Sequence, residues 1–308
     1  MRFASLKRIE VTTEIEGLAR HRLDETSILL PAINHGEMMF PLAGQDYPTS
    51  SEALADSIKE ALGEVLVLPQ NARVVTIDGG AFPALASVKV DLTDARIKTE
   101  SPPPPPRKPA GDRQPGPTVE RLNVFGKPIR FPDGTANFDL SATDATFDFA
   151  RDVQSRPLLV LTGAQSGHVD FSIGAADLQS LLRAAATAGA KLQGVTIQDL
   201  QVTLTSQGPR TIDAVVRVKA KKMMMSGAVI LRGRVGIDDA LVATISNLSC
   251  TGEGMMGNMA AGMIQAKLRQ FDGKQIPLTT FSLGELALRD LKISTDNGLR
   301  VTADVGKK

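Results

Sequence analysis

Apolar and polar residues alternate along most of the chain from Val195 to Val305, and a period of two is typical of half-buried β-strands. The alternation is regular in residues 200–204, 212–218, 229–237 and 241–245. Two further strands are predicted at Ser282–Ile293 and Leu299–Val305. Short connections between successive strands favour antiparallel pairing, with one face of the sheet dry and the other wet.

Three segments instead have the helical period. Thr49–Leu66 is expected to begin at an N-cap, Ser50 or Ser51, and Ser172–Leu192 is expected to be capped by Ser172. The third predicted helix, Met255–Phe271, interrupts the C-terminal strands. The fold class that follows is α+β: a long, highly curved antiparallel sheet wrapped around a long apolar helix.

The third helix is rich in methionine, a flexible side chain that suits variable apolar partners. One interpretation of its methionines is ordinary core packing, and the other is an apolar tunnel. If there is a tunnel, apolar residues of two helices and two strands should line it. These residues are Met255, Met259, Met263, Leu268, Leu178, Leu182, Val202, Leu204, Val216 and Val218.

A proline-rich segment, Ser101–Thr118, divides the chain and is predicted to be an extended, disordered loop. Strand patterns at Ser87–Lys98 and Val119–Phe131 flank it, so we expect one sheet to continue across it and a single domain to cover residues 49–308. Residues 1–48 are interpreted as additional strands of the same sheet.

Composition narrows the possible functions. The 308 residues include 42% hydrophobic residues, no Trp and one Tyr, and the net charge is +1. The scarcity of aromatic rings and the balanced charge argue against carbohydrate or nucleic-acid binding. The N-terminal residues carry charges throughout, and no window has the roughly 18 apolar residues of a membrane span. We therefore expect a cytoplasmic protein, able at most to bind peripherally at a membrane.

Catalytic and metal-binding patterns are not apparent. His21, His35 and His168 are far apart, and the single Cys250 is interpreted as a small buried residue, so neither a metal nor a cofactor is predicted. Residues 252–257 fit G-x-G-x-x-G, which suggests nucleotide binding, but the neighbouring strands are not those of a βαβ unit. A turn that lets a helix pack closely on a strand is the favoured interpretation.

Basic residues gather around a methionine-rich turn. No acidic residue lies between Asp213 and Asp238. The cluster has two possible interpretations. It is either a solvated basic sheet face with the methionines folded into the core, or a site that docks on anionic membranes. The candidate docking residues are Lys221, Lys222, Met223, Met224, Met225, Arg232 and Arg234.

The segment Gly79–Leu85 leading into Val88–Ala95, together with the alternating strands and the late apolar helix, resembles the LmeA-like phospholipid-binding proteins. The segment from Asp170 to Phe281 resembles the rest of such a domain. These proteins belong to the tubular lipid-binding (TULIP) superfamily. The resemblance implies a curved sheet around a long helix, with acyl chains held inside the tube and no catalytic residues.

The function we expect is therefore non-catalytic binding of a lipid or fatty acyl ligand in an internal tunnel, for transfer, carriage or sensing. The tunnel mouth is expected near the basic turn, where the protein could meet an anionic membrane. The alternative is a β-rich scaffold or adaptor without a ligand, which uses its surface or its polyproline segment to bind protein partners. The sequence leaves the oligomeric state open.

Overall fold

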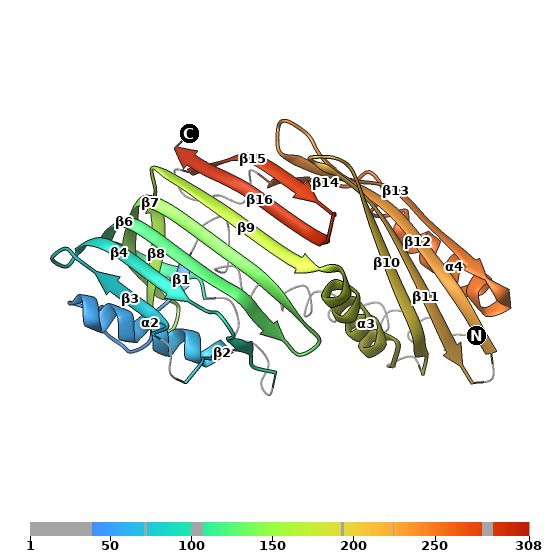
Figure 1. The fold of residues 1–308 in the computed structure, drawn as a ribbon, viewed down its shortest axis with the longest axis horizontal. Coiled ribbons are helices and arrows are strands. Elements are labelled where there is room, and N and C mark those ends of the chain that lie inside the picture. Colours follow the sequence, from blue (N-terminus) through green and yellow to red (C-terminus); the bar gives the residue numbers. More distant parts are fainter. Residues whose placement is uncertain are drawn as a thin grey trace, which may run out of the picture.

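The computed structural model describes residues 39–70, 73–99, 107–191, 194–223, 225–278 and 286–307. Within them the fold is mixed α+β, mostly sheet, with two sheets and three helices. Figure 1 shows two lobes side by side. We call residues 39–174 and 286–307 the first lobe and residues 175–278 the second lobe.

The first lobe contains an eleven-stranded sheet whose main path runs β15-β16-β9-β7-β6-β4-β3. Its short strands β1, β2, β5 and β8 pair off this path. The bounds are β1 Met39–Pro41, β2 Leu66–Val67, β3 Val75–Asp78, β4 Ala84–Asp91, β5 Arg96–Ile97, β6 Pro109–Phe131, β7 Gly134–Asp152, β8 Pro157–Gly163, β9 Ser166–Gly174, β15 Leu286–Ser294 and β16 Gly298–Lys307.

The second lobe contains a five-stranded sheet in which neighbouring strands are consecutive and antiparallel. Its strands are β10 Thr196–Gly208, β11 Thr211–Lys222, β12 Met225–Ile237, β13 Val242–Glu253 and β14 Gln275–Pro277. The predicted antiparallel meander is confirmed. It forms a sheet of its own, however, because after Gly174 the chain leaves the first sheet through a helix.

The helices form where the spacing of apolar residues changes from the period of two to the helical period. α2, Ser51–Val65, has Ser50 as its N-cap, whose Oγ accepts a hydrogen bond from the amide of Ala53 at 3.1 Å, as predicted. α3, Ala175–Lys191, begins later than expected. Ser172 is not its cap, because β9 continues to Gly174 and pairs Ser172 with both neighbouring strands. α4 covers Gly254–Leu268.

Two expectations for the first lobe need correction. β4 and β6 run parallel, so this sheet is not wholly antiparallel. The proline-rich segment is also not loop throughout: residues 100–106 lie outside the described residues, but β6 begins at Pro109. Before Thr118, β6 pairs only with β7, so its prolines occupy an edge where no second neighbour needs their missing N–H.

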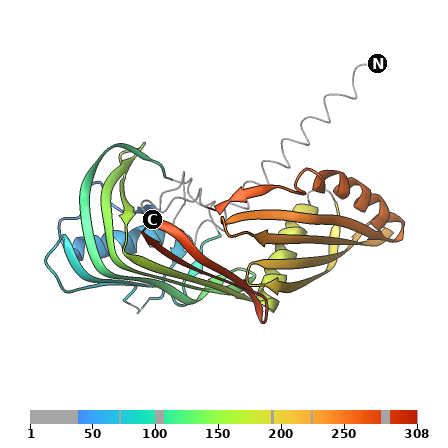
Figure 2. The ribbon, with the colours of Figure 1, turned by 90° about the horizontal axis from the view of Figure 1, so that it is seen from above.

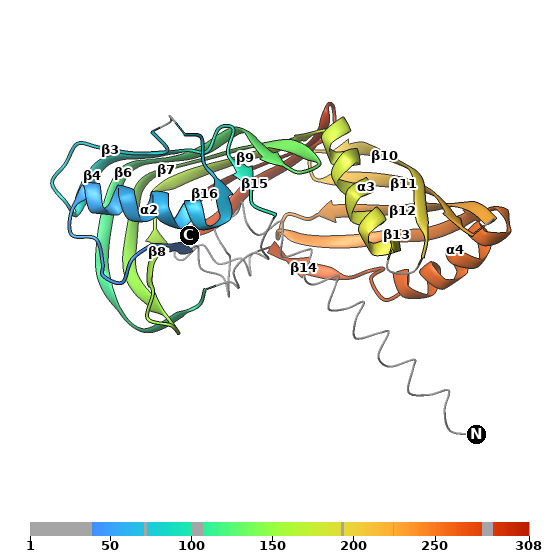
Figure 3. The same cartoon turned by 90° about the horizontal axis from the view of Figure 1, so that it is seen from below.

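The second lobe is inserted into the first. The chain leaves the first sheet after β9 and returns in β15 and β16, and β16 pairs with β9 along its whole length. Residues 1–38, predicted as strands, lie outside the described residues, whereas β1 pairs with β8 of the first sheet. Figure 3 shows α3 standing between the lobes, where it packs against β7, β9 and β16 on one side and β10 on the other.

The hydrophobic core lies mainly in the first lobe. A large cluster of buried residues joins α2 to the inner face of the first sheet, with Leu54, Leu85, Ile129 and Phe147 among its members. A smaller cluster joins the lobes through Ile212 and Leu291.

Candidate functional site

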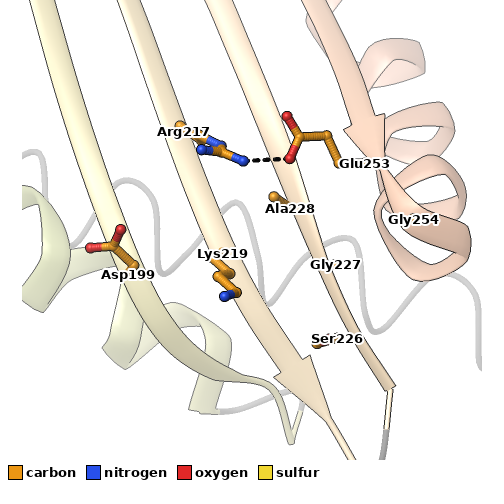
Figure 4. A pocket seen from close by; sticks show the side chains of 8 residues that line it. All are labelled: Asp199, Arg217, Lys219, Ser226, Gly227, Ala228, Glu253 and Gly254. Atoms are coloured by element: carbon orange, nitrogen blue, oxygen red, sulfur yellow. Dashed lines mark hydrogen bonds and ion pairs between the residues drawn. The ribbon is translucent and has the colours of Figure 1, made fainter.

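The five-stranded sheet has one apolar face. The strand register places Val202, Val216 and Leu231 in one row across β10, β11 and β12, and Leu200, Val218 and Val229 in the next. α3 packs against β10 and α4 against β12 and β13. In Figure 4 both helices lie behind the strands. We call the part of the apolar sheet face that lies between α3 and α4 the trough, and these two rows are its floor.

α4 approaches the sheet through small residues. Gly257 and Ala261 are its buried residues. A Cβ on Gly252 of β13 would overlap the carbonyl group of Gly257, and one on Gly227 of β12 would lie 2.5 Å from the Gly257 amide nitrogen. Gln265 secures the other end, accepting a hydrogen bond from the amide of Cys250 at 2.6 Å. The helix therefore lies directly on the strands, with no layer of large side chains between.

This packing turns the methionine stripe outward. Met255, Met259 and Met263 lie on the side of α4 opposite to Gly257 and Ala261, and they are 74%, 68% and 67% exposed. They were expected to line a tunnel, and in this structure they do not. The reason is steric: only the glycine side of the helix lets its backbone come so close to β12 and β13.

The other predicted tunnel residues lie around the trough. Val202, Leu204, Val216 and Val218 are half-buried in the strands and Leu268 is half-buried on α4. On α3, Leu178 is half-buried and Leu182 is exposed. The register brings the four strand residues together on one face, whereas the outward methionines do not join them.

The trough is not filled by a core of its own. The hydrophobic clusters of the described residues lie in the first lobe or at the junction between the lobes. α3 has no fully buried residue along its 17 positions, and α4 has only two. A sheet face and two helices that are apolar but half-exposed leave a surface that an apolar ligand can cover.

The opposite face of this sheet is polar and carries a pocket of about 430 Å³ (Figure 4). Arg217 of β11 donates to Glu253 of β13 at 2.5 Å across the pocket. Asp199 and Lys219 form its other charged wall, and backbone at Ser226, Gly227 and Gly254 forms its end. Two cations and two carboxylates in one shallow pocket suit a small charged or zwitterionic group. Sequence reasoning missed it, because its residues come from four strands.

The predicted docking residues separate into two groups. Met223 is 85% exposed and Lys221 and Lys222 are exposed at the same turn, whereas Met224 lies outside the described residues. Arg232 and Arg234 lie on the polar sheet face, roughly 25 Å along β12 from the turn. Arg234 donates two hydrogen bonds to Asp213, at 2.6 and 2.9 Å, which lower the pKa of that carboxyl. The arginines therefore do not belong to the turn.

The glycines of the G-x-G-x-x-G motif serve the fold. Gly252 and Gly257 face each other across the helix–sheet contact, and Gly254 has φ of +75°, which favours glycine. The approach that a nucleotide phosphate would need at Gly252 is occupied by the backbone of Gly257. A strand-to-helix turn with close packing, the interpretation favoured from the sequence, accounts for the motif.

The described residues contain few groups that could act in catalysis or bind a metal. No cluster of His, Cys, Asp and Glu there could hold a metal ion. His168 forms an exposed pair with Asp304, whose Oδ1 lies 2.6 Å from Nδ1, across β9 and β16. Cys250 is buried, as expected, and burial raises the pKa of its thiol.

The helices that the structure describes include none with the length and apolar character of a membrane span. No protein-family model matches the chain, and searches of curated proteins and of solved structures found no match either.

Proposed function

We propose that the second lobe binds a long apolar ligand, such as the acyl chain of a lipid, in the trough between α3 and α4. The observation that carries this proposal is the partly exposed apolar floor, with Val202, Val216 and Leu231 in one row and no buried cluster of the described residues above it. Such binding requires no reacting group. It is non-catalytic in character and suits a carrier, transfer protein or sensor.

The dimensions of the trough suit a chain-like ligand. β11 has 12 residues and therefore extends roughly 40 Å. Burial gains about 0.8 kcal/mol per methylene, so about ten methylenes gain roughly 8 kcal/mol before the cost of association is subtracted. α3 gives the trough a wall without a fully buried residue, so a ligand can pack against it without displacing a core side chain.

This proposal keeps the ligand class expected from the resemblance to LmeA-like proteins and changes the container. The expected container was a tube around a methionine-lined helix. The proposed one is an open trough, because α4 packs through Gly257 and Ala261 and its methionines point away. A closed tube around the ligand would require α3 to move towards α4 when the ligand binds. This movement is part of the proposed function.

Titration with a fluorescent fatty acid tests the proposal. Val216→Thr with Val218→Thr keeps the shape of the floor but places two hydroxyl groups there, and should weaken binding by about tenfold or more. Val215→Thr is the matched control, because Val215 lies on the same strand but on the polar face, opposite Arg232. Its affinity should stay within about twofold of that of the unmodified protein.

Native mass spectrometry of gently purified protein provides the second measurement, with a co-purifying lipid as the expected result. A clean ligand-free mass, together with no uptake of fatty acid, would rule out the proposed function. Equal loss of affinity in the floor and control variants would place the ligand elsewhere in the molecule.

A further inference from the structure

The outer side of α4 is apolar from its first turn to its last. Met255, Met259 and Met263 are its large side chains, and Gly262 and Ala266 are exposed among them. Twelve of the 15 residues of the helix are apolar or glycine, yet only its sheet side is buried. A strongly apolar helix is normally buried on all sides, so this face of α4 lacks a partner among the residues that the structure describes.

The methionine-rich turn adjoins the start of α4. A Cβ on Gly254 would lie 3.7 Å from the carbonyl oxygen of Ser226, next to Met225, and a Cβ on Gly227 would touch Gly257. Met223 and Met225 at the turn are exposed, as is Met255 in the first turn of the helix. Figures 1 and 2 show this turn and α4 at the end of the second lobe farthest from the first lobe.

The unpaired charges closest in sequence to these methionines are positive. Lys221 and Lys222 are exposed at the end of β11 and form no ion pair within the described residues. Lys267 and Arg269 follow at the far end of α4, and no acidic residue occurs from Gly254 to Gln270. The nearest carboxylate, Glu253, is already paired with Arg217. The surface is therefore apolar in the middle and cationic around it.

We propose that this surface docks on an anionic lipid bilayer. It consists of Met223, Met225, Met255, Met259 and Met263, with Lys221 and Lys222 beside them, and we call it the docking surface. α4 lies parallel to the membrane, its methionines enter the boundary between headgroups and acyl chains, and the lysines meet anionic headgroups. A second copy of the chain would place like charges together, so the charge pattern favours lipid.

The docking surface is independent of the trough. It uses the outer side of α4 and the end of the β11–β12 hairpin, whereas the trough uses the apolar sheet face between α3 and α4, with Val202, Val216 and Leu231 in its floor. Membrane docking therefore does not require that the proposed ligand binds. The two proposals can therefore fail separately. Vesicle binding without uptake of fatty acid would contradict only the proposed function, and uptake of fatty acid without vesicle binding would contradict only the docking surface.

Co-sedimentation with vesicles tests the docking surface. We expect the full chain to bind vesicles of phosphatidylcholine with phosphatidylserine, and to bind vesicles of phosphatidylcholine alone at least about tenfold more weakly. Affinity for the anionic vesicles should fall as salt is added. Met255→Gln, Met259→Gln and Met263→Gln together should weaken binding by about tenfold or more. Glutamine is a good helix former, and these positions are exposed, so the fold should persist.

Matched variants separate this surface from general effects. Lys221→Gln with Lys222→Gln should weaken binding to anionic vesicles by about tenfold. Arg232→Gln with Arg234→Gln removes the same two charges from the polar face and should change binding by less than about threefold. Val153→Gln removes an exposed apolar residue, 78% exposed, from the first lobe and should have no effect.

Oxidation of the unmodified protein gives an independent reading. Peroxide converts exposed methionines to sulfoxides, and peptide mass spectrometry measures the extent at each position. Anionic vesicles should protect Met223, Met255, Met259 and Met263 severalfold. Oxidation that is unchanged by vesicles, or vesicle binding that the methionine and lysine variants leave intact, would overturn the proposal. So would a change from dimer to monomer in the methionine variant without a change in vesicle binding.

Discussion

Gly252 of β13 and Gly257 of α4 meet backbone to backbone, with no space for a Cβ on Gly252. Gly252→Ala should therefore push α4 off the sheet and lower the free energy of unfolding by about 1–3 kcal/mol. The measurement is urea denaturation followed by circular dichroism. This contact also explains why a phosphate-binding pattern in the sequence encodes helix packing.

The same helix provides the control for that variant. A Cβ on Gly262 would meet open space, and replacing an exposed helical glycine with alanine is favourable by up to about 1 kcal/mol. Gly262→Ala should therefore leave stability unchanged or increase it. If the two variants were equally destabilised, the close approach of Gly252 and Gly257 would not be what holds α4.

Cys250 offers a direct probe of α4. It is buried, burial raises the pKa of its thiol, and its amide donates to Gln265 of the helix. Alkylation by iodoacetamide near pH 7.5 should therefore be slow in the native protein, because the reactive thiolate is scarce and covered. In Gly252→Ala the rate should rise severalfold, whereas in Gly262→Ala it should match the native rate. Fast alkylation of the native protein would contradict the packing described for α4.

Lowering the pH should decrease the free energy of unfolding, because Asp152 becomes protonated. Burial alone would raise the pKa of this carboxyl, but hydrogen bonds from Arg156 and Gln154 outweigh burial and hold the pKa below its usual value. A lowered pKa in the folded state means that the carboxylate stabilises the fold above its unfolded pKa, about 3.9, and that this contribution disappears as pH falls through the folded value.

Asp152→Asn should accordingly lower the free energy of unfolding by about 1–3 kcal/mol at pH 7, and the difference from the native protein should shrink towards pH 3. Denaturant titrations at several pH values provide the measurement. Asp56→Asn, at an exposed position of α2, is the control and should show no such trend. A difference that stayed constant with pH would show that the effect of Asp152 is not ionic.

The junction between the lobes depends on a few hydrogen bonds. Thr295 Oγ1 accepts from the amide of Ser206 at 3.0 Å, and Arg210 Nε donates to the carbonyl of Leu291 at 3.0 Å. Thr295→Val leaves the Ser206 amide without its partner, at a cost of about 1–2 kcal/mol. Hydrogen exchange should then quicken in residues 206–211 and 291–295. Thr205→Val, at an exposed neighbouring position, should leave exchange there unchanged.

Local features of this fold could be predicted from the sequence. Ser50 is a good N-cap before an apolar helical stripe, and β10 to β13 alternate regularly, so their type and approximate bounds follow from short stretches of residues. The strand residues of the trough could also be predicted, because alternation places Val202, Val216 and Val218 on one face.

Features that depend on distant contacts could not be predicted. Apolar residues are spread around most of α4, so their spacing does not show which side meets the sheet, and the contacts with Gly227 and Gly252 determine that side. The parallel pairing of β4 with β6 and the antiparallel pairing of β16 with β9 join segments whose separation in sequence leaves no local signal. The polar pocket likewise draws Asp199, Arg217 and Glu253 from separate strands.

The insertion of one lobe within the other has a consequence for how the protein is made. During synthesis, the whole second lobe emerges from the ribosome before β15 and β16, so one edge of β9 remains unpaired until β16 has emerged. The second lobe can complete its meander from neighbouring strands in that interval. The first sheet is completed later, and the emergence of β16 therefore sets the moment at which the edge of β9 is protected from edge-to-edge association.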